Sequence, residues 1–198
     1  VNAQIFLRGV PEDYDTWATQ GNDEWSFQKL LPFFRSNEHD MDVRDDFHGD
    51  SGPIRARRFK YDELNPEHRA FYDACRAVGY VDSPDHNSPD STGVGPFVLN
   101  NPEGIRWSTS VGYLSQVRHR LNLTIKADSM VHRILLDGRR AVGVQVESGG
   151  ELFEVYGEEV ILCGGAIGSP QTLMLSGIGP AAHLDDLDIS VVHDLQGV

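Results

Sequence analysis

A glycine-rich stretch after a short apolar run constrains the fold of this chain more than any other feature. Residues 160–180 read V-I-L-C-G-G-A-I-G-S-P-Q-T-L-M-L-S-G-I-G-P. The run Val160–Cys163 predicts a strand, and Ser169-Pro170 after the glycines is typical of a helix start. Glycines let backbone N–H groups approach a ligand, and a helix N-terminus attracts an anion. This order is typical of a nucleotide-binding fold, although the turn alone fits an ordinary α/β connection equally well.

The segment before this stretch predicts a β-meander. Apolar or alternating runs occupy residues 122–127, 130–136, 141–147 and 152–155. Asp137-Gly138 and Gly149-Gly150 separate the last three of them and are strong hairpin-turn signals. We therefore expect β-structure that leads directly into the glycine turn.

The first 120 residues predict helices with a few short strands. Helices are expected after Pro11, after Ser26, from Pro66 to Val78, and from Thr109 to Val117. Strands are expected at residues 54–58 and 97–99, and residues 80–95 predict a long loop.

An acidic run between residues 38 and 50 raises the question of a metal site. Its carboxylates and imidazoles are ligand types for hard cations and zinc, and they are Glu38, His39, Asp40, Asp42, Asp45, Asp46, His48 and Asp50. A calcium loop starting at Asp40 would have Arg44 at its fifth position and Asp45 at the position reserved for glycine. The run therefore predicts a solvated acidic loop, and no metal ligand is assigned.

The charge balance excludes one class of partner. The formal net charge is −13 and the isoelectric point is near 4.9, whereas nucleic-acid binding requires a basic surface. No apolar run approaches the roughly twenty residues that a membrane span needs. Cys75 and Cys163 are predicted to be buried thiols, which favours a reducing, cytoplasmic compartment. Because Val1 is not an initiator methionine, both ends are expected to be cuts through a longer polypeptide.

Two long motifs carry a resemblance to a known family. Gly165–Gly179 resembles the second sequence signature of the glucose–methanol–choline (GMC) flavin oxidoreductases, with Thr172 as its one departure. Val1–Gly9, continuing to Ala18, resembles the second half of that family's first signature. Further landmarks lie at residues 48–53, 107–109, 122–124 and 131–144, so the resemblance covers essentially the whole chain.

The resemblance implies an α/β fold that contains a partial FAD/NAD(P)-binding, Rossmann-like domain with a β-meander, together with part of a substrate-binding domain. Residues 1–50 would extend the FAD domain, residues 51–105 would belong to the substrate-binding domain and its loop, and residues 106–198 would return to the FAD domain.

The resemblance also implies FAD as the cofactor. Asn2 and Ala3 would lie against the flavin and its phosphates. Val131 would contact the adenine through its backbone. Cys163, Gly164 and Ala166 would pass beside the adenosine half.

The activity implied is that of an FAD-dependent, choline dehydrogenase-like enzyme, which transfers hydride from an alcohol CH–OH to flavin N5. Its partner would be a small-molecule alcohol, with the electron acceptor left open. The family's amino-terminal G-x-G-x-x-G is not in this chain, and its catalytic histidine would lie beyond Val198. We therefore expect an internal fragment, inactive by itself, and assign no catalytic residue. A non-catalytic scaffold and a redox-neutral lyase of the same family remain alternatives.

Overall fold

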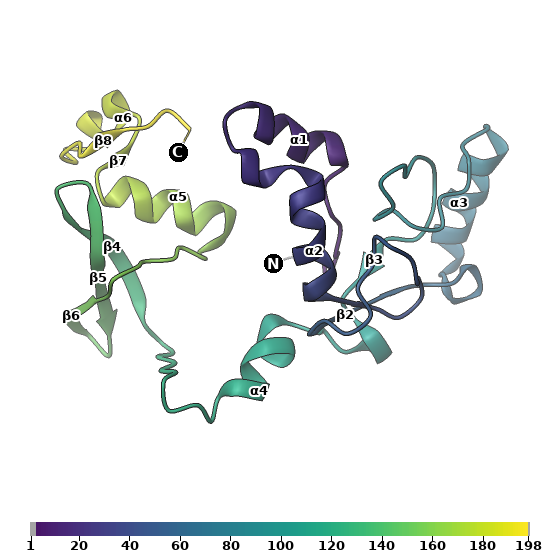
Figure 1. The fold of residues 1–198 in the computed structure, drawn as a ribbon, viewed down its shortest axis with the longest axis horizontal. Helices are drawn as coiled ribbons and strands as arrows, with labels where there is room; N and C mark the ends of the chain where they lie inside the picture. Colours follow the sequence, from purple (N-terminus) through teal and green to yellow (C-terminus); the bar gives the residue numbers. More distant parts are fainter. Residues whose placement is uncertain (1–2, 198) are drawn as a thin grey trace. The chain divides into compact units, whose positions relative to one another are not determined.

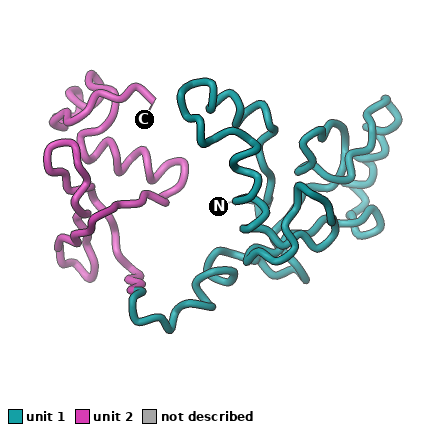
Figure 2. Tube along the Cα trace, in the orientation of Figure 1, with its two compact units in different colours: residues 1–123 teal, residues 124–198 magenta. Residues whose placement is uncertain are grey.

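The chain divides into two compact units, shown in Figure 2. Unit 1 is Val1–Leu123 and unit 2 is Thr124–Val198. The computed structural model describes residues 3–197. Helices and sheets occur in both units, and the expected α/β class is confirmed (Figure 1).

The predicted helices of unit 1 form, and local sequence explains their ends. α1 (Pro11–Thr19) has proline at its first position and an acidic first turn. α3 (Pro66–Ala77) begins where the Asn65 side chain accepts a hydrogen bond from His68 N–H, and the chain reverses at Gly79 with φ of +100°. The other helical segments are α2 (Phe27–Asn37), η1 (Asp23–Trp25), η2 (Tyr61–Glu63), η3 (Pro102–Gly104), the π-helical turn η4 (Ser110–Leu114) and α4 (Ser115–Val117).

A small sheet holds unit 1 together. β1 (Glu38–Asp40) runs parallel to β2 (Ile54–Arg58), which pairs antiparallel with β3 (Val98–Leu99). Ile5 forms a bridge to Leu99, so the amino-terminal segment adds to the same sheet. The core beside it contains the buried residues Phe27, Ile54, Ala56 and Val98.

Unit 2 contains the predicted meander and the helix that follows it. β4 (Met130–Asp137), β5 (Arg140–Ser148) and β6 (Glu151–Tyr156) form an antiparallel sheet. Both predicted hairpins form, with positive φ at Gly138, Gly149 and Gly150. Gly149-Gly150 is the second loop as predicted, whereas the first loop is Gly138-Arg139 because Asp137 still pairs with Arg140. The remaining elements are α5 (Gly165–Leu175), β7 (Ile178–Gly179), α6 (Ala181–Asp186) and β8 (His193–Asp194).

Several expectations for individual segments were wrong. Residues 122–127 and Val160–Cys163 form no strand, because no described segment pairs with them. The helix near the glycines begins at Gly165 and not at Ser169, and it includes Pro170. Neither cysteine is a buried thiol, since Cys163 is exposed and Cys75 is partly exposed.

Ser176 joins the helix to the meander. Its hydroxyl accepts a hydrogen bond from Ile134 N–H at 2.8 Å and donates to Thr172 O at 2.6 Å. Ser176 and Ile134 are both buried. The contact therefore fixes α5 against β4.

We expect Ser176→Ala to lower the free energy of unfolding of unit 2 by about 1–3 kcal/mol, because it leaves a buried N–H without a partner. Chemical denaturation followed by circular dichroism measures the loss. Ser190→Ala, at an exposed serine of the same unit, should change stability by less than about 0.5 kcal/mol. Equal effects of the two substitutions would contradict the assigned role.

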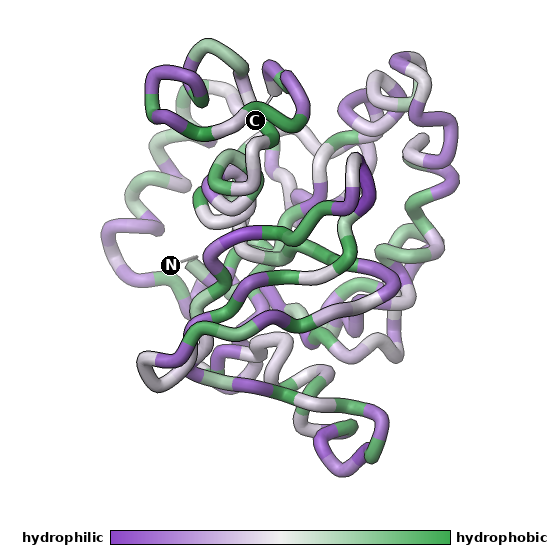
Figure 3. The backbone as a smooth tube through the Cα atoms, turned by 90° about the vertical axis from the view of Figure 1, so that its left-hand side faces the viewer, coloured by the Kyte–Doolittle hydropathy of each residue, from purple (hydrophilic) through white to green (hydrophobic). Residues whose placement is uncertain are grey.

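Hydrophilic and hydrophobic residues are interspersed along the backbone in Figure 3. Among the described residues, no helix has the length and apolar character needed to cross a membrane.

Candidate functional site

A cavity within unit 2 brings together three of the residues predicted to bind FAD. Its volume is about 480 Å³, and its walls include Val131 of β4 together with Cys163 and Gly164. These residues are separated by about thirty positions in the sequence but meet where the loop before α5 passes the meander. The sequence selected these residues one by one, and the structure brings them together at one cavity.

The walls of this cavity fit a nucleoside-sized group. Ligand cavities have volumes of roughly 300–1,000 Å³. At Gly164 an added Cβ would lie 3.0 Å from Ser169 N, so any side chain there would crowd the turn. α5 begins at Gly165, which has φ of +80° and directly follows the wall residue Gly164. The unpaired N–H groups of a helix N-terminus attract anions.

Of the other residues predicted to contact FAD, the structure describes Ala166 and Ala3. Ala166 is exposed in the first turn of α5 and does not line it. Ala3 lies in unit 1, and Asn2 lies outside the described residues.

Ala3 borders a second cavity, of about 500 Å³, that lies within unit 1. Its other walls come from Gln4, Ile5 and residues between Asn100 and Thr109. Gln4 has a positive φ of 66°, and its carbonyl accepts a hydrogen bond from Asn100 N–H. Sequence reasoning did not select Gln4 or Asn100, since only spatial proximity to Ala3 distinguishes them.

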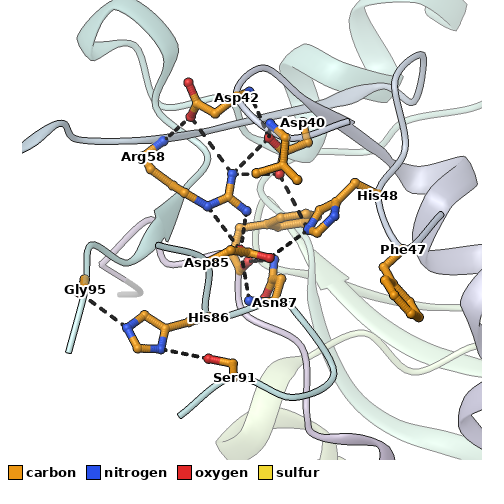
Figure 4. A network of polar contacts seen from close by, with 12 residues as sticks. Asp40, Asp42, Phe47, His48, Arg58, Asp85, His86, Asn87, Ser91 and Gly95 are labelled. Atoms are coloured by element: carbon orange, nitrogen blue, oxygen red, sulfur yellow. Dashed lines mark hydrogen bonds and ion pairs between the residues drawn. The ribbon is translucent and has the colours of Figure 1, made fainter. Parts of the chain in front are cut away.

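A third feature, which we call the charge cluster, lies at the sheet of unit 1 (Figure 4). It consists of six ionisable residues whose side chains are at most 10% exposed, and these are Arg8, Glu38, Asp40, His48, Arg58 and Asp85. The expectation of a solvated acidic loop was therefore wrong for Glu38, Asp40 and His48. Two arginines from distant positions pair with the buried carboxylates, and no local pattern reveals that pairing.

Arg58 is the central cation of the cluster. Its Nη1 donates to both carboxylate oxygens of Asp40, at 2.9 and 2.8 Å. Its Nε donates to Asp85 Oδ1 at 3.1 Å, and its Nη2 contacts the same oxygen. Figure 4 shows the guanidinium between the two carboxylates. Ion pairs this deeply buried are stable only when the geometry and the remaining hydrogen bonds are satisfied.

Glu38 and Asp85 lie in contrasting environments. Burial raises the pKa of Glu38 above its usual 4.5, although Arg8 and the Gly49 N–H oppose the shift. For Asp85 burial acts in the same direction, but the ion-pair contact with His48 and the hydrogen bonds from Asn87 N–H and Arg58 outweigh it and hold the pKa well below 3.8. Asp85 is therefore an anion over the working range of pH.

The carboxylates of Glu38 and Asp40 and the His48 imidazole have ligand atoms within 4.8 Å of one another. Glu38 Oε1 and His48 Nε2 have no hydrogen-bond partner, but the other carboxylate oxygens are engaged. Glu38 Oε2 accepts from Arg8 and from Gly49 N–H, and both oxygens of Asp40 accept from Arg58. A cation there would have to compete with two guanidinium groups.

The comparisons with known proteins agree on one family. Residues 1–196 match the family described as GMC oxidoreductase. The chain is 41% identical over 199 residues to an oxygen-dependent choline dehydrogenase of Photobacterium profundum, covering all of this chain and 35% of that protein. It is 41% identical over 200 residues to the mitochondrial choline dehydrogenase of Homo sapiens, covering 33% of it. The chain thus spans about a third of the length of these relatives.

Solved structures give the same result for the fold. Pyridoxine 4-oxidase from Mesorbium loti matches with a TM-score of 0.89 and 34% identity, over all of this chain and 39% of that one. An FAD-dependent oxidoreductase from Chaetomium thermophilum matches with a TM-score of 0.86 and 29% identity, over all of this chain and 37% of that one.

Proposed function

The chain belongs to the GMC oxidoreductase family, and we propose on this basis that the whole protein oxidises a small alcohol with FAD. The family and its FAD-dependent structural neighbour indicate FAD as the cofactor. When bound, FAD supplies the acceptor for a hydride from the alcohol carbon. The residues of this chain contribute cofactor binding and orientation.

One observation of the structure supports the proposed FAD site. Val131, Cys163 and Gly164, selected from the sequence, line one cavity at the start of α5. We assign the adenosine half of FAD to this cavity, with Ala166 at the helix N-terminus. We assign the flavin side to Asn2 and Ala3.

The substrate we propose is choline or a similar small alcohol, because relatives about 40% identical carry the name choline dehydrogenase. The assignment of residues 51–105 to the substrate-binding part stays a prediction, as does the cytoplasmic location.

Expression of the complete protein tests the proposal. We expect a flavin absorbance spectrum that bleaches when choline is added without oxygen. A folded but colourless protein would support the scaffold alternative. Bound flavin that cleaves a cyanohydrin and does not bleach with any alcohol would support the lyase alternative.

The adenosine assignment leads to a prediction for Cys163, which is exposed at the cavity wall. Cys163→Trp should fill the cavity and weaken FAD binding at least about tenfold, a change of about 1.4 kcal/mol. Ultrafiltration and flavin fluorescence of the complete protein measure the binding.

The matched control places the same bulky side chain in another cavity of unit 2. Ser190 is exposed and lines a cavity with Arg133, Leu136 and Ile189. Ser190→Trp should leave FAD binding unchanged. If Ser190→Trp weakened FAD binding and Cys163→Trp did not, the adenosine would have to be assigned to the cavity lined by Ser190.

A further inference from the structure

When Glu38, Asp40 and Asp85 are all ionised, the charge cluster has a charge imbalance that a proton on His48 corrects. The buried acids are Glu38, Asp40 and Asp85, which carry three negative charges, and the two arginines supply two positive charges. A net buried charge is far more costly than a paired one. One further positive charge makes the cluster neutral, and His48 is the remaining ionisable member.

The surroundings of the His48 ring agree with a charged imidazolium. Nδ1 lies 2.7 Å from Asp45 Oδ1. On the other side Nε2 lies 3.2 Å from Asp85 Oδ2, an ion-pair contact without hydrogen-bond alignment, and 3.8 Å from Asp40 Oδ2. A neutral imidazole would turn one lone pair toward a carboxylate, whereas the imidazolium has a donor on each nitrogen.

The cluster also fixes the segment that carries Ala3. Arg8 Nη2 donates to Glu38 Oε2 at 2.5 Å, and its Nη1 donates to Phe47 O at 2.6 Å. The backbone N–H of Arg8 donates to Asn87 Oδ1, and Asn87 Nδ2 donates to Phe6 O, each at 3.0 Å.

Asn87 is in turn placed by the cluster. Its backbone N–H donates to Asp85 Oδ1 at 3.0 Å. Asp85 is the carboxylate that faces both His48 and Arg58. The contacts therefore run without interruption from the His48 ring to the backbone at residues 6 and 8.

We propose that His48 is a positioning residue that acts as a proton-dependent clamp on the segment from Ala3 to Arg8. With the proton bound, the cluster is neutral and holds Arg8 and Asn87. Without the proton, the cluster has a net buried negative charge, and its contacts with this segment weaken. The part of the proposal that concerns FAD rests on the proposed function, and the part that concerns stability does not.

The groups that face His48 set the direction of its pH response. They come from its own loop (Asp45), from β1 (Glu38 and Asp40), from the loop after α3 (Asp85), and from the two arginine-bearing segments of the cluster. Burial alone would lower the pKa of His48. The contact with Asp85, the hydrogen bond to Asp45 and the charge of Glu38 outweigh burial and raise the pKa of His48 above 6.5.

The sign of the stability change follows from this shift. A histidine that binds its proton more tightly in the folded state contributes its full stabilisation below pH 6.5. The contribution is lost as the pH rises through the raised folded value. The folding equilibrium constant should fall about tenfold for each unit by which the folded pKa exceeds the unfolded one.

The experiment measures the urea midpoint and the rate of FAD release of the complete protein between about pH 6 and 9. We expect the midpoint to fall and FAD release to accelerate as the pH rises. His48→Gln should show neither trend and should resemble the unsubstituted protein at high pH. His39→Gln, whose side chain alternates to the other face of β1, should keep both trends.

Nitrogen NMR of the His48 ring in the unsubstituted protein shows whether the ring is an imidazolium, even if His48→Gln fails to fold. Imidazolium shifts at both nitrogens above pH 6.5 are expected, and a neutral tautomer there would overturn the proposal. A rise in the urea midpoint with added Zn²⁺ at high pH, reversed by EDTA, would also overturn it, because it would assign a metal to the cluster.

The two proposals fail in different ways. If the complete protein binds no FAD but its urea midpoint still falls as the pH rises, the proposed function is refuted and the proposed role of His48 in stability stands. A protein whose stability follows the pH as described, but whose bound FAD is released at the same rate at every pH, refutes the link to Ala3.

Discussion

Replacing Arg58 with alanine is expected to lower the free energy of unfolding of unit 1 by about 3–5 kcal/mol. The substitution leaves Asp40 and Asp85 buried without the guanidinium that accounts for four of their contacts. Urea denaturation followed by tryptophan fluorescence is a suitable measurement, because Trp107 donates its indole N–H to Pro53 O just before β2.

The neighbouring arginine provides a matched control. Arg57 on the same strand pairs with Glu63 at 3.0 Å, and their side chains are 20% and 41% exposed. Arg57→Ala should therefore cost no more than about 1 kcal/mol. A similar loss for both substitutions would mean that burial in the charge cluster adds nothing to an ordinary surface ion pair.

Gly49→Ala is expected to destabilise unit 1 by about 3 kcal/mol through overpacking. An added Cβ would lie 1.9 Å from Arg35 O and 2.4 Å from Glu38 O. Both are backbone atoms, so a change of side-chain rotamer cannot relieve the contact. The shift required would also disturb the Asp40 N–H bond to Gly49 O, which is 2.8 Å long.

Gly168→Ala is the contrasting substitution. Gly168 lies inside α5, and an added Cβ would meet no atom within 4 Å. Alanine there should stabilise the helix by about 0.5–1 kcal/mol, because glycine loses more conformational entropy on folding. Urea denaturation followed by circular dichroism checks both variants. A Gly49→Ala protein as stable as the original would show that α2 and β1 can separate without cost.

Local sequence signals were sufficient for the elements that depend on local geometry. The turns at Gly138 and Gly149-Gly150 require positive φ, which glycine adopts at low cost, and both were predicted. The start of α3 at Pro66 and its reversal at Gly79 follow from capping chemistry that involves only neighbouring residues. The two signatures likewise identified the family without any tertiary information.

Signals that depend on a distant partner were read wrongly. Val160–Cys163 has the composition of a strand, yet a strand exists only where another segment supplies hydrogen bonds. The acidic run has the composition of a surface loop, yet Glu38 and Asp40 are fully buried. Arg8 and Arg58, thirty and eighteen positions away from their partners, make that burial possible.

The glycine-rich stretch at residues 160–180 shows the same division. By itself the sequence determined the family, the helix and the residues expected to line an FAD site, because these are encoded in contiguous motifs. Only the tertiary structure placed Val131 beside Cys163 and Gly164, and gathered six ionisable side chains into a buried cluster. The physical reason is that burial and charge pairing depend on distances in space, and the linear order of residues does not specify those distances.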